Sequence, residues 1–156
     1  MGISKQQILL VGVNLLESLT KEDSRKFLRD FSKWREPQDC DEEEINKFPP
    51  SIIDKIKEFK TSVPRKGIID LIHKEGLYLI SDSMGYDFIY LGYVVSAGYK
   101  DEDYEVKFRG KLHEPNEDEK EDVLNAAKEF MDSTGYDFAE WSLENDFGLH
   151  LFTRYS

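Results

Sequence analysis

The densest run of potential ligand atoms lies between Asp39 and Glu44, where five of six side chains are carboxylates. A calcium loop of the EF-hand type needs oxygen ligands at alternating positions, a central glycine and a distant bidentate glutamate. None of that spacing is present. We therefore interpret the run as the solvated, acidic start of a helix. Glycoside hydrolysis needs a pair of carboxylates, and nothing in the sequence singles out such a pair.

Other chemistry-bearing residues are scattered. The three histidines are His73, His113 and His150, and no His-x₃-His or Cys-His spacing indicates a zinc site. The single cysteine, Cys40, cannot form an internal disulfide, and its acidic neighbours are expected to raise the pKa of its thiol. No serine lies in a Gly-x-Ser-x-Gly context. We predict no metal, no cofactor and no enzymatic activity, with an enzyme that uses ordinary carboxylates kept as an alternative.

The acidity of the chain is a local property. Between Lys100 and Asp146 there are sixteen acidic and six basic side chains, which account for −10 of the total net charge of −11. Such a field repels nucleic acid and anionic lipid and attracts basic partners. Aromatic rings are mixed with carboxylates in 99–104 and 136–141, and tyrosine and tryptophan often form the centre of protein interfaces. The alternative is that the acids serve solubility alone.

These features favour a binding function. We predict a small acidic cytoplasmic protein that binds and inhibits a basic macromolecular partner, such as a nuclease or toxin, in the manner of an immunity protein or antitoxin. Nucleic acid and membranes are not expected as partners. The alternative is a small-molecule-binding or regulatory module that uses the aromatic face of a sheet. The candidate contact residues are Asp101, Glu102, Asp103, Tyr104, Glu117, Asp118, Glu121, Tyr136, Asp137, Glu140 and Trp141.

The first half of the chain is expected to be helical. Apolar residues from Ile8 to Leu19 recur at helical spacing, although Gly12 weakens that helix and a short buried strand through Val13 is the competing interpretation. The apolar run is too short for a membrane span and has no cleavage site of a secretory signal. Further helices are predicted from an N-cap at Thr20 to about Arg35, as a short turn opened by 41–44 that carries Ile45 and Phe48, after an N-cap at Ser51, and from Pro64 to Gly76.

The second half changes to alternating patterns. Strands are predicted at 77–80, 88–95 and 104–109, followed by a helix over about 116–134 whose Asn116 and Glu119 match a capping box. Two last strands, 138–143 and 149–155, are expected to pair with each other. The fold class is therefore α+β, with four to five short N-terminal helices packed on a C-terminal antiparallel sheet of order β-β-β-α-β-β. We expect one domain over 1–156, mainly helical in 1–76 and mainly sheet in 77–156.

A short segment occurs twice. Residues 82–88 read Asp-Ser-Met-Gly-Tyr-Asp-Phe, and residues 132–138 read Asp-Ser-Thr-Gly-Tyr-Asp-Phe. We interpret both copies as turns in which glycine supplies a positive φ that ends one element. The functional alternative is that Tyr86 and Tyr136 begin neighbouring strands and present paired rings to a ligand or partner.

Overall fold

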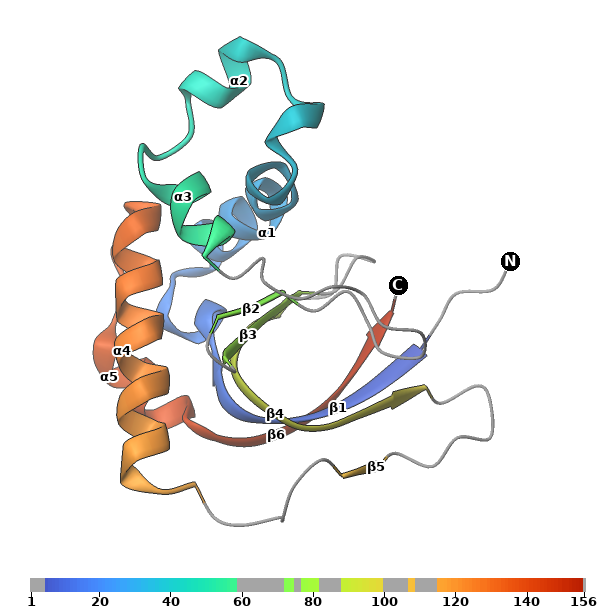
Figure 1. The fold of residues 1–156 in the computed structure, drawn as a ribbon. Coiled ribbons are helices and arrows are strands. Elements are labelled where there is room, and N and C mark those ends of the chain that lie inside the picture. The colour runs from blue at the N-terminus through green and yellow to red at the C-terminus, as the bar shows by residue number, and fades with distance from the viewer. Residues whose placement is uncertain are drawn as a thin grey trace.

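The computed structural model describes residues 5–58, 72–74, 77–81, 88–99, 107–108 and 115–155. Helices gather at one end of a strongly curved antiparallel sheet (Figure 1). The strands are β1 (Lys5–Asn14), β2 (Ile72–Lys74), β3 (Leu77–Ser81), β4 (Ile89–Tyr99), β5 (Lys107–Phe108) and β6 (Gly148–Tyr155). The helices are α1 (Lys21–Arg35), α2 (Glu42–Asn46), α3 (Ile52–Lys57), α4 (Glu117–Thr134) and α5 (Glu140–Asp146), with 3₁₀ turns η1 (Leu15–Ser18) and η2 (Pro37–Asp39).

The strand order of the sheet is β2-β3-β4-β1-β6, and β5 pairs with the far end of β4. The first strand is therefore central, with Leu10 opposite both Val94 and His150. The mixed α+β class is confirmed, whereas the predicted helix from Ile8 to Leu19 is wrong because this segment forms β1 and η1. A central strand that is covered on both faces is apolar on all sides, and Ile8, Leu10 and Val13 are all fully buried. A buried helix has the same continuous apolar pattern, so the sequence does not distinguish the two.

Three glycines lie side by side across the middle of the sheet. Gly12 of β1 is opposite Gly92 of β4 and Gly148 of β6. A Cβ atom added to Gly12 would overlap the carbonyl oxygen of Leu91, and one added to Gly92 would overlap that of Val11. These two strands therefore approach more closely than side chains would allow. Glycine at such positions permits the sharp bending of β1, β4 and β6 that Figure 1 shows.

Two of the helices α1 to α3 begin with a side-chain cap. The Thr20 Oγ1 accepts the Asp23 N–H at 3.2 Å at the start of α1, and Asp41 Oδ1 accepts the Glu44 N–H at 2.8 Å at the start of α2. Ser51 precedes α3 as predicted but makes no side-chain cap. The helix predicted from Pro64 lies largely outside the described residues. Ile72, which was expected within that helix, lies in β2.

The predicted helix over 116–134 is confirmed as α4. The Asn116 side chain accepts the Glu119 N–H at 2.8 Å, and Glu119 Oε1 accepts the Asn116 N–H at 3.2 Å, which completes the capping box. Gly135 ends the helix with a φ of 77°, in the left-handed region that favours glycine. This second copy of the repeated segment is therefore a turn. In the first copy, positions 82–87 lie outside the described residues.

The strand predicted over 138–143 is wrong, because residues 140–146 form helix α5. The aromatic residues of this segment suggested a strand, yet Leu143 is its only fully buried side chain and Trp141 is exposed. Consequently β6 has no preceding strand with which to pair. It lies against β1 instead, from Lys5 opposite Tyr155 to Gly12 opposite Gly148. The predicted order β-β-β-α-β-β is corrected accordingly.

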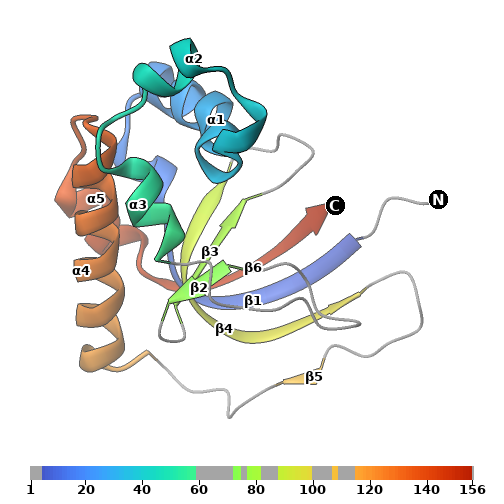
Figure 2. The same ribbon diagram turned by 45° about the horizontal axis from the view of Figure 1, so that its top comes forward.

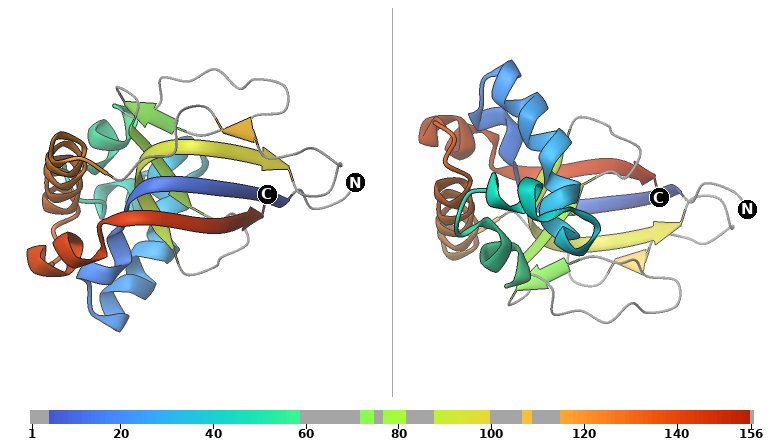
Figure 3. Two further views of the ribbon diagram at one scale, coloured as in Figure 1. Left: turned by 90° about the horizontal axis from the view of Figure 1, so that it is seen from below. Right: turned by 90° about the horizontal axis from the view of Figure 1, so that it is seen from above.

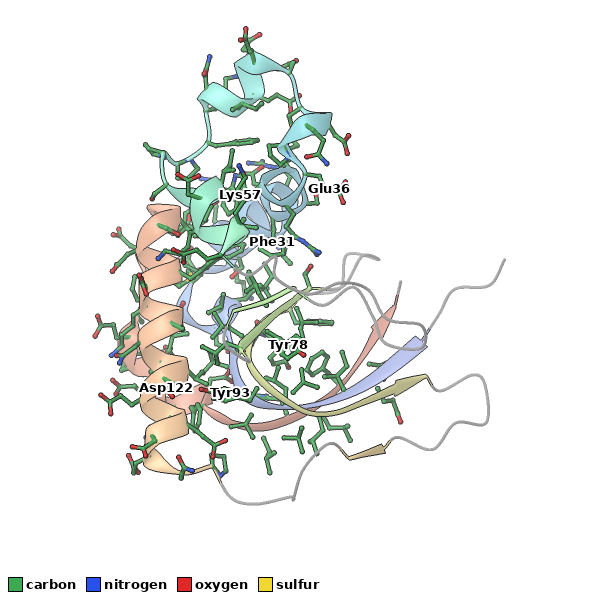
Figure 4. The ribbon with its side chains drawn as sticks, in the orientation of Figure 1. Phe31, Glu36, Lys57, Tyr78, Tyr93 and Asp122 are labelled. Atoms are coloured by element: carbon green, nitrogen blue, oxygen red, sulfur yellow. The ribbon has the colours of Figure 1, made fainter. Side chains whose placement is uncertain are left out.

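Both faces of the bent sheet are apolar. One face packs against α1, α3, α4 and α5, where the ring of Phe27 contacts those of Trp34 and Phe130. Figures 1 and 2 show α4 and α5 along one side of this helical layer and α1 to α3 above. The inner face of the curve holds a second cluster of Ile8, Leu10, Ile80 and Phe88. Figure 4 shows Tyr78 inside the curve.

Candidate interaction surface

The helices α4 and α5 form the acidic part of the described structure. From Pro115 to Phe147 the chain carries eleven acidic and two basic side chains, a net charge of −9. Glu117 and Asp118 lie exposed in the first turn of α4, where the positive end of the helix dipole stabilises carboxylates. Local helix physics therefore explains two of these acids without reference to a partner.

Several of the remaining acids have partners. Lys128 Nζ lies 3.6 Å from Glu140 and 3.5 Å from Glu144, and so links α4 to α5. Lys55 of α3 lies 2.7 Å from Glu129, and the hydroxyl of Tyr93 donates to Asp122 at 3.1 Å (Figure 4). Within the described stretch from Pro115 to Phe147, five exposed carboxylates make no ion pair or hydrogen bond. They are Glu117, Asp118, Glu121, Asp132 and Asp137.

Trp141 is the largest exposed ring on this surface. Its side chain is 68 % exposed on α5, with Glu140 beside it and Glu144 one turn further along. An exposed tryptophan keeps a large apolar area in water, and rings of this kind are the commonest energetic centres of protein interfaces when a partner covers them. The adjacent carboxylates of Glu140 and Glu144 border this ring and share a single cation, Lys128, so the pair keeps a net negative charge.

Tyr136, by contrast, belongs to the core. Its ring centroid lies 6.0 Å from that of Phe27 and 6.5 Å from that of Trp34. Partial burial, followed by the nearby carboxylate of Asp30, raises the pKa of the Tyr136 hydroxyl above its usual value. The residue lies in the link between α4 and α5 and begins no strand. We therefore leave it out of the interaction surface.

The structure describes seven of the eleven sequence-predicted contact residues. Asp101, Glu102, Asp103 and Tyr104 lie outside the described residues. The others divide between the start of α4 (Glu117, Asp118 and Glu121), the link (Tyr136 and Asp137) and the start of α5 (Glu140 and Trp141). Sequence reasoning missed Glu144 and Lys128. The i, i+4 spacing of Glu140 and Glu144 would have indicated a shared face had α5 been expected as a helix.

A second group of aromatic and polar side chains lies on the inner face of the sheet. The rings of Tyr90 and Phe152 stack at 4.2 Å, and the His150 ring lies 5.1 Å from Tyr90. His150 Nε2 donates to the backbone carbonyl of Asp146 at 2.8 Å, while Asp146 Oδ2 accepts the N–H of Asn14 at 2.6 Å. Burial, then the charge of Asp146, raises the pKa of Tyr90.

The described residues hold no group of three or more His, Cys, Asp or Glu side chains arranged to bind a metal ion. None of the helices described is long and apolar enough to cross a membrane. Partial burial, followed by the carboxylate of Glu44, raises the pKa of the Cys40 thiol, in the direction expected from the sequence. No protein-family model, curated protein or solved structure matches the chain.

Proposed function

We propose that the chain is a small cytoplasmic binding protein that inhibits a basic macromolecular partner through the surface of α4 and α5. The observation that carries this proposal is the 68 % exposed Trp141 beside Glu140 and Glu144, in the stretch of α4 and α5 whose net charge is −9. A solubilising surface requires carboxylates but gains nothing from a large exposed ring. The combination is typical of a surface that a cationic protein covers.

Two physical effects would act in sequence. The uncompensated carboxylates Glu117, Asp118 and Glu121 would accelerate the approach of a cationic surface, and this effect weakens as salt is added. The ring of Trp141 would then be buried in the contact. Removing a ring of this kind from an interface costs about 2 kcal/mol or more, which corresponds to about 30-fold in affinity.

An enzyme that acts on nucleic acid is the natural class of target. Its substrate site is basic because it binds phosphate, and a layer of carboxylates competes for the same cationic side chains. The protein would then act as an immunity protein or antitoxin does. The same negative field disfavours direct binding of nucleic acid or of an anionic membrane surface.

The test starts from the partner recovered by affinity capture from the native cell and then purified. We expect its affinity to fall at least about tenfold between low and moderate salt. Trp141→Ala should weaken binding about 30-fold. Glu117→Gln combined with Asp118→Asn should slow association.

The matched control is Glu42→Gln combined with Glu43→Gln on α2, which removes the same charge from exposed positions elsewhere. If the two pairs of substitutions slow association equally, net charge alone is responsible and the proposed surface is wrong. An affinity that changes neither with salt concentration nor on Trp141→Ala substitution contradicts the proposal as a whole.

The stacked rings on the inner face favour a second candidate, a small-molecule-binding or regulatory module. Tyr90 and Phe152 are partly exposed there, and His150 supplies a polar group beside them. Thermal unfolding in the presence of a metabolite library tests this function. A compound that stabilises the Trp141→Ala variant but not a Tyr90→Ala variant supports it, whereas the reverse dependence contradicts it.

A further inference from the structure

The strand β6 lies at the edge of the sheet. It pairs with β1 on one side, and among the described residues no strand pairs with its other side (Figure 3). Its eight residues form an uninterrupted register with β1 and extend over about 27 Å at the usual rise of a strand. An edge of this length presents a row of backbone N–H and C=O groups that a further strand can bind.

The features that usually protect such an edge are missing from β6. Gly148–Tyr155 contains no proline, no lysine and no carboxylate, in a chain whose net charge is −11. Leu149 and Leu151 are 44 % and 72 % exposed and lie on the same face of the strand. Their neighbours on β1 are Val11, which is buried, and Leu9, which is partly exposed. Natural edge strands that remain unpaired commonly carry charge or a bulge at such positions.

We propose that β6 pairs antiparallel with β6 of a second copy of this chain, around a twofold axis at Leu151. The two Leu151 side chains then face each other, and Leu149 faces Thr153 of the second copy. The two sheets become one continuous sheet, and the exposed Leu151 side chains of the two copies lie against each other. An antiparallel pairing of identical strands satisfies the closed symmetry that most homodimers have.

The distribution of charge along β6 favours a second copy of the chain as the partner and an antiparallel direction of pairing. The acidic helix α5, with Glu144 and Asp146, immediately precedes the strand, whereas Arg154 lies near its other end. Antiparallel pairing places each Arg154 opposite Gly148 of the second copy, next to the acidic end of its α5. This register therefore brings position 154 of each copy to the acidic end of the other copy's α5, whereas an in-register parallel pairing would set Arg154 opposite Arg154. A cationic strand from a basic partner would instead meet an edge that holds no carboxylate.

Sedimentation of the full chain from about 1 to 500 µM tests the proposal. A single pair of strands buries less than a standard interface, so we expect a monomer–dimer equilibrium in the micromolar range. Leu151→Lys should weaken the dimer at least about tenfold, because a charge on the edge strand opposes pairing. Arg154→Glu should also weaken it by placing acids against acids. Unchanged far-ultraviolet circular dichroism and thermal unfolding of each diluted variant confirm that it remains folded.

Trp141→Ala is the matched control, since it removes a larger exposed side chain outside the edge and should leave the dimer unchanged. The proposal is overturned if the chain stays monomeric throughout the concentration range. It is also overturned if Leu151→Lys dimerises as the unaltered chain does, or if Trp141→Ala dissociates the dimer while Leu151→Lys does not. None of these results depends on the proposed basic partner.

Discussion

Asn14 joins three parts of the fold, and its substitution gives the most direct test of the structure. It lies buried at the end of β1, and its Oδ1 accepts the backbone N–H of Leu16 at 3.2 Å and of Ile89 at 3.1 Å. Its own N–H donates to Asp146. The side chain thus ties the end of β1 to η1 and to the start of β4.

Asn14→Ala removes the shared acceptor and leaves two buried N–H groups without a partner. Each unsatisfied group of this kind costs about 1–3 kcal/mol, so the free energy of unfolding should fall by about 2–6 kcal/mol. The bond from the backbone of residue 14 to Asp146 is unaffected, because alanine keeps the N–H. A loss of this size is a large part of the total stability of a typical domain, which is about 5–15 kcal/mol.

Equilibrium unfolding in urea measures this loss. The control is Asn116→Ala, which removes an exposed cap from α4 and should cost about 1 kcal/mol. If Asn14→Ala costs no more than Asn116→Ala, the two N–H groups find other partners or water, and the reasoning from burial is refuted. An unchanged dependence on urea concentration confirms that both variants expose the same surface on unfolding.

Three further predictions concern other parts of the chain. Gly92→Ala should lower the thermal unfolding temperature far more than Gly148→Ala. A Cβ added at Gly92 overlaps β1, whereas one added at Gly148 meets nothing within 4 Å. Similar effects of the two substitutions would contradict the close approach of β1 and β4. The pKa of Tyr136 is higher in the folded chain than in the unfolded chain, where it is about 10. The stability that burial of the neutral hydroxyl contributes is therefore complete below the unfolded pKa and is lost as the pH rises through the folded pKa. Urea unfolding from about pH 8 to 11.5 should therefore show a smaller decline for Tyr136→Phe, and equal declines would count against this burial. Cys40 should react with iodoacetamide at pH 8 more slowly than a free thiol, and equal rates would show that its pKa is not raised.

Features that depend on neighbouring residues could be predicted from the sequence. The cap at Thr20, the capping box at Asn116 and the left-handed Gly135 each require only a few adjacent positions, and all three are confirmed. The strands β3 and β4 were also expected, because alternating apolar residues follow the turn-rich segments.

Features that depend on distant packing could not be predicted. The strand β1 is apolar on all sides because sheet neighbours and two hydrophobic clusters surround it, and this pattern also fits a buried helix. The short helix α5 is fixed partly by a contact far along the chain, in which the N–H of Ala139 donates to the carbonyl of Ser18 at 2.9 Å. Likewise, the acidity of the candidate surface was evident, but composition does not show that Trp141 is exposed while Tyr136 is packed.

The central position of β1 has a consequence for how the chain folds during synthesis. Leu10 is paired with Val94 and His150, which follow it by 84 and 140 residues. At about 5–20 residues per second, a ribosome adds the second partner about 7–28 seconds after the first strand. Until β6 has been synthesised, one edge of the apolar strand β1 can pair with other chains. Long-range pairing of this kind also slows folding, so β1, which precedes the other described strands along the chain, is among the last of them to be completed.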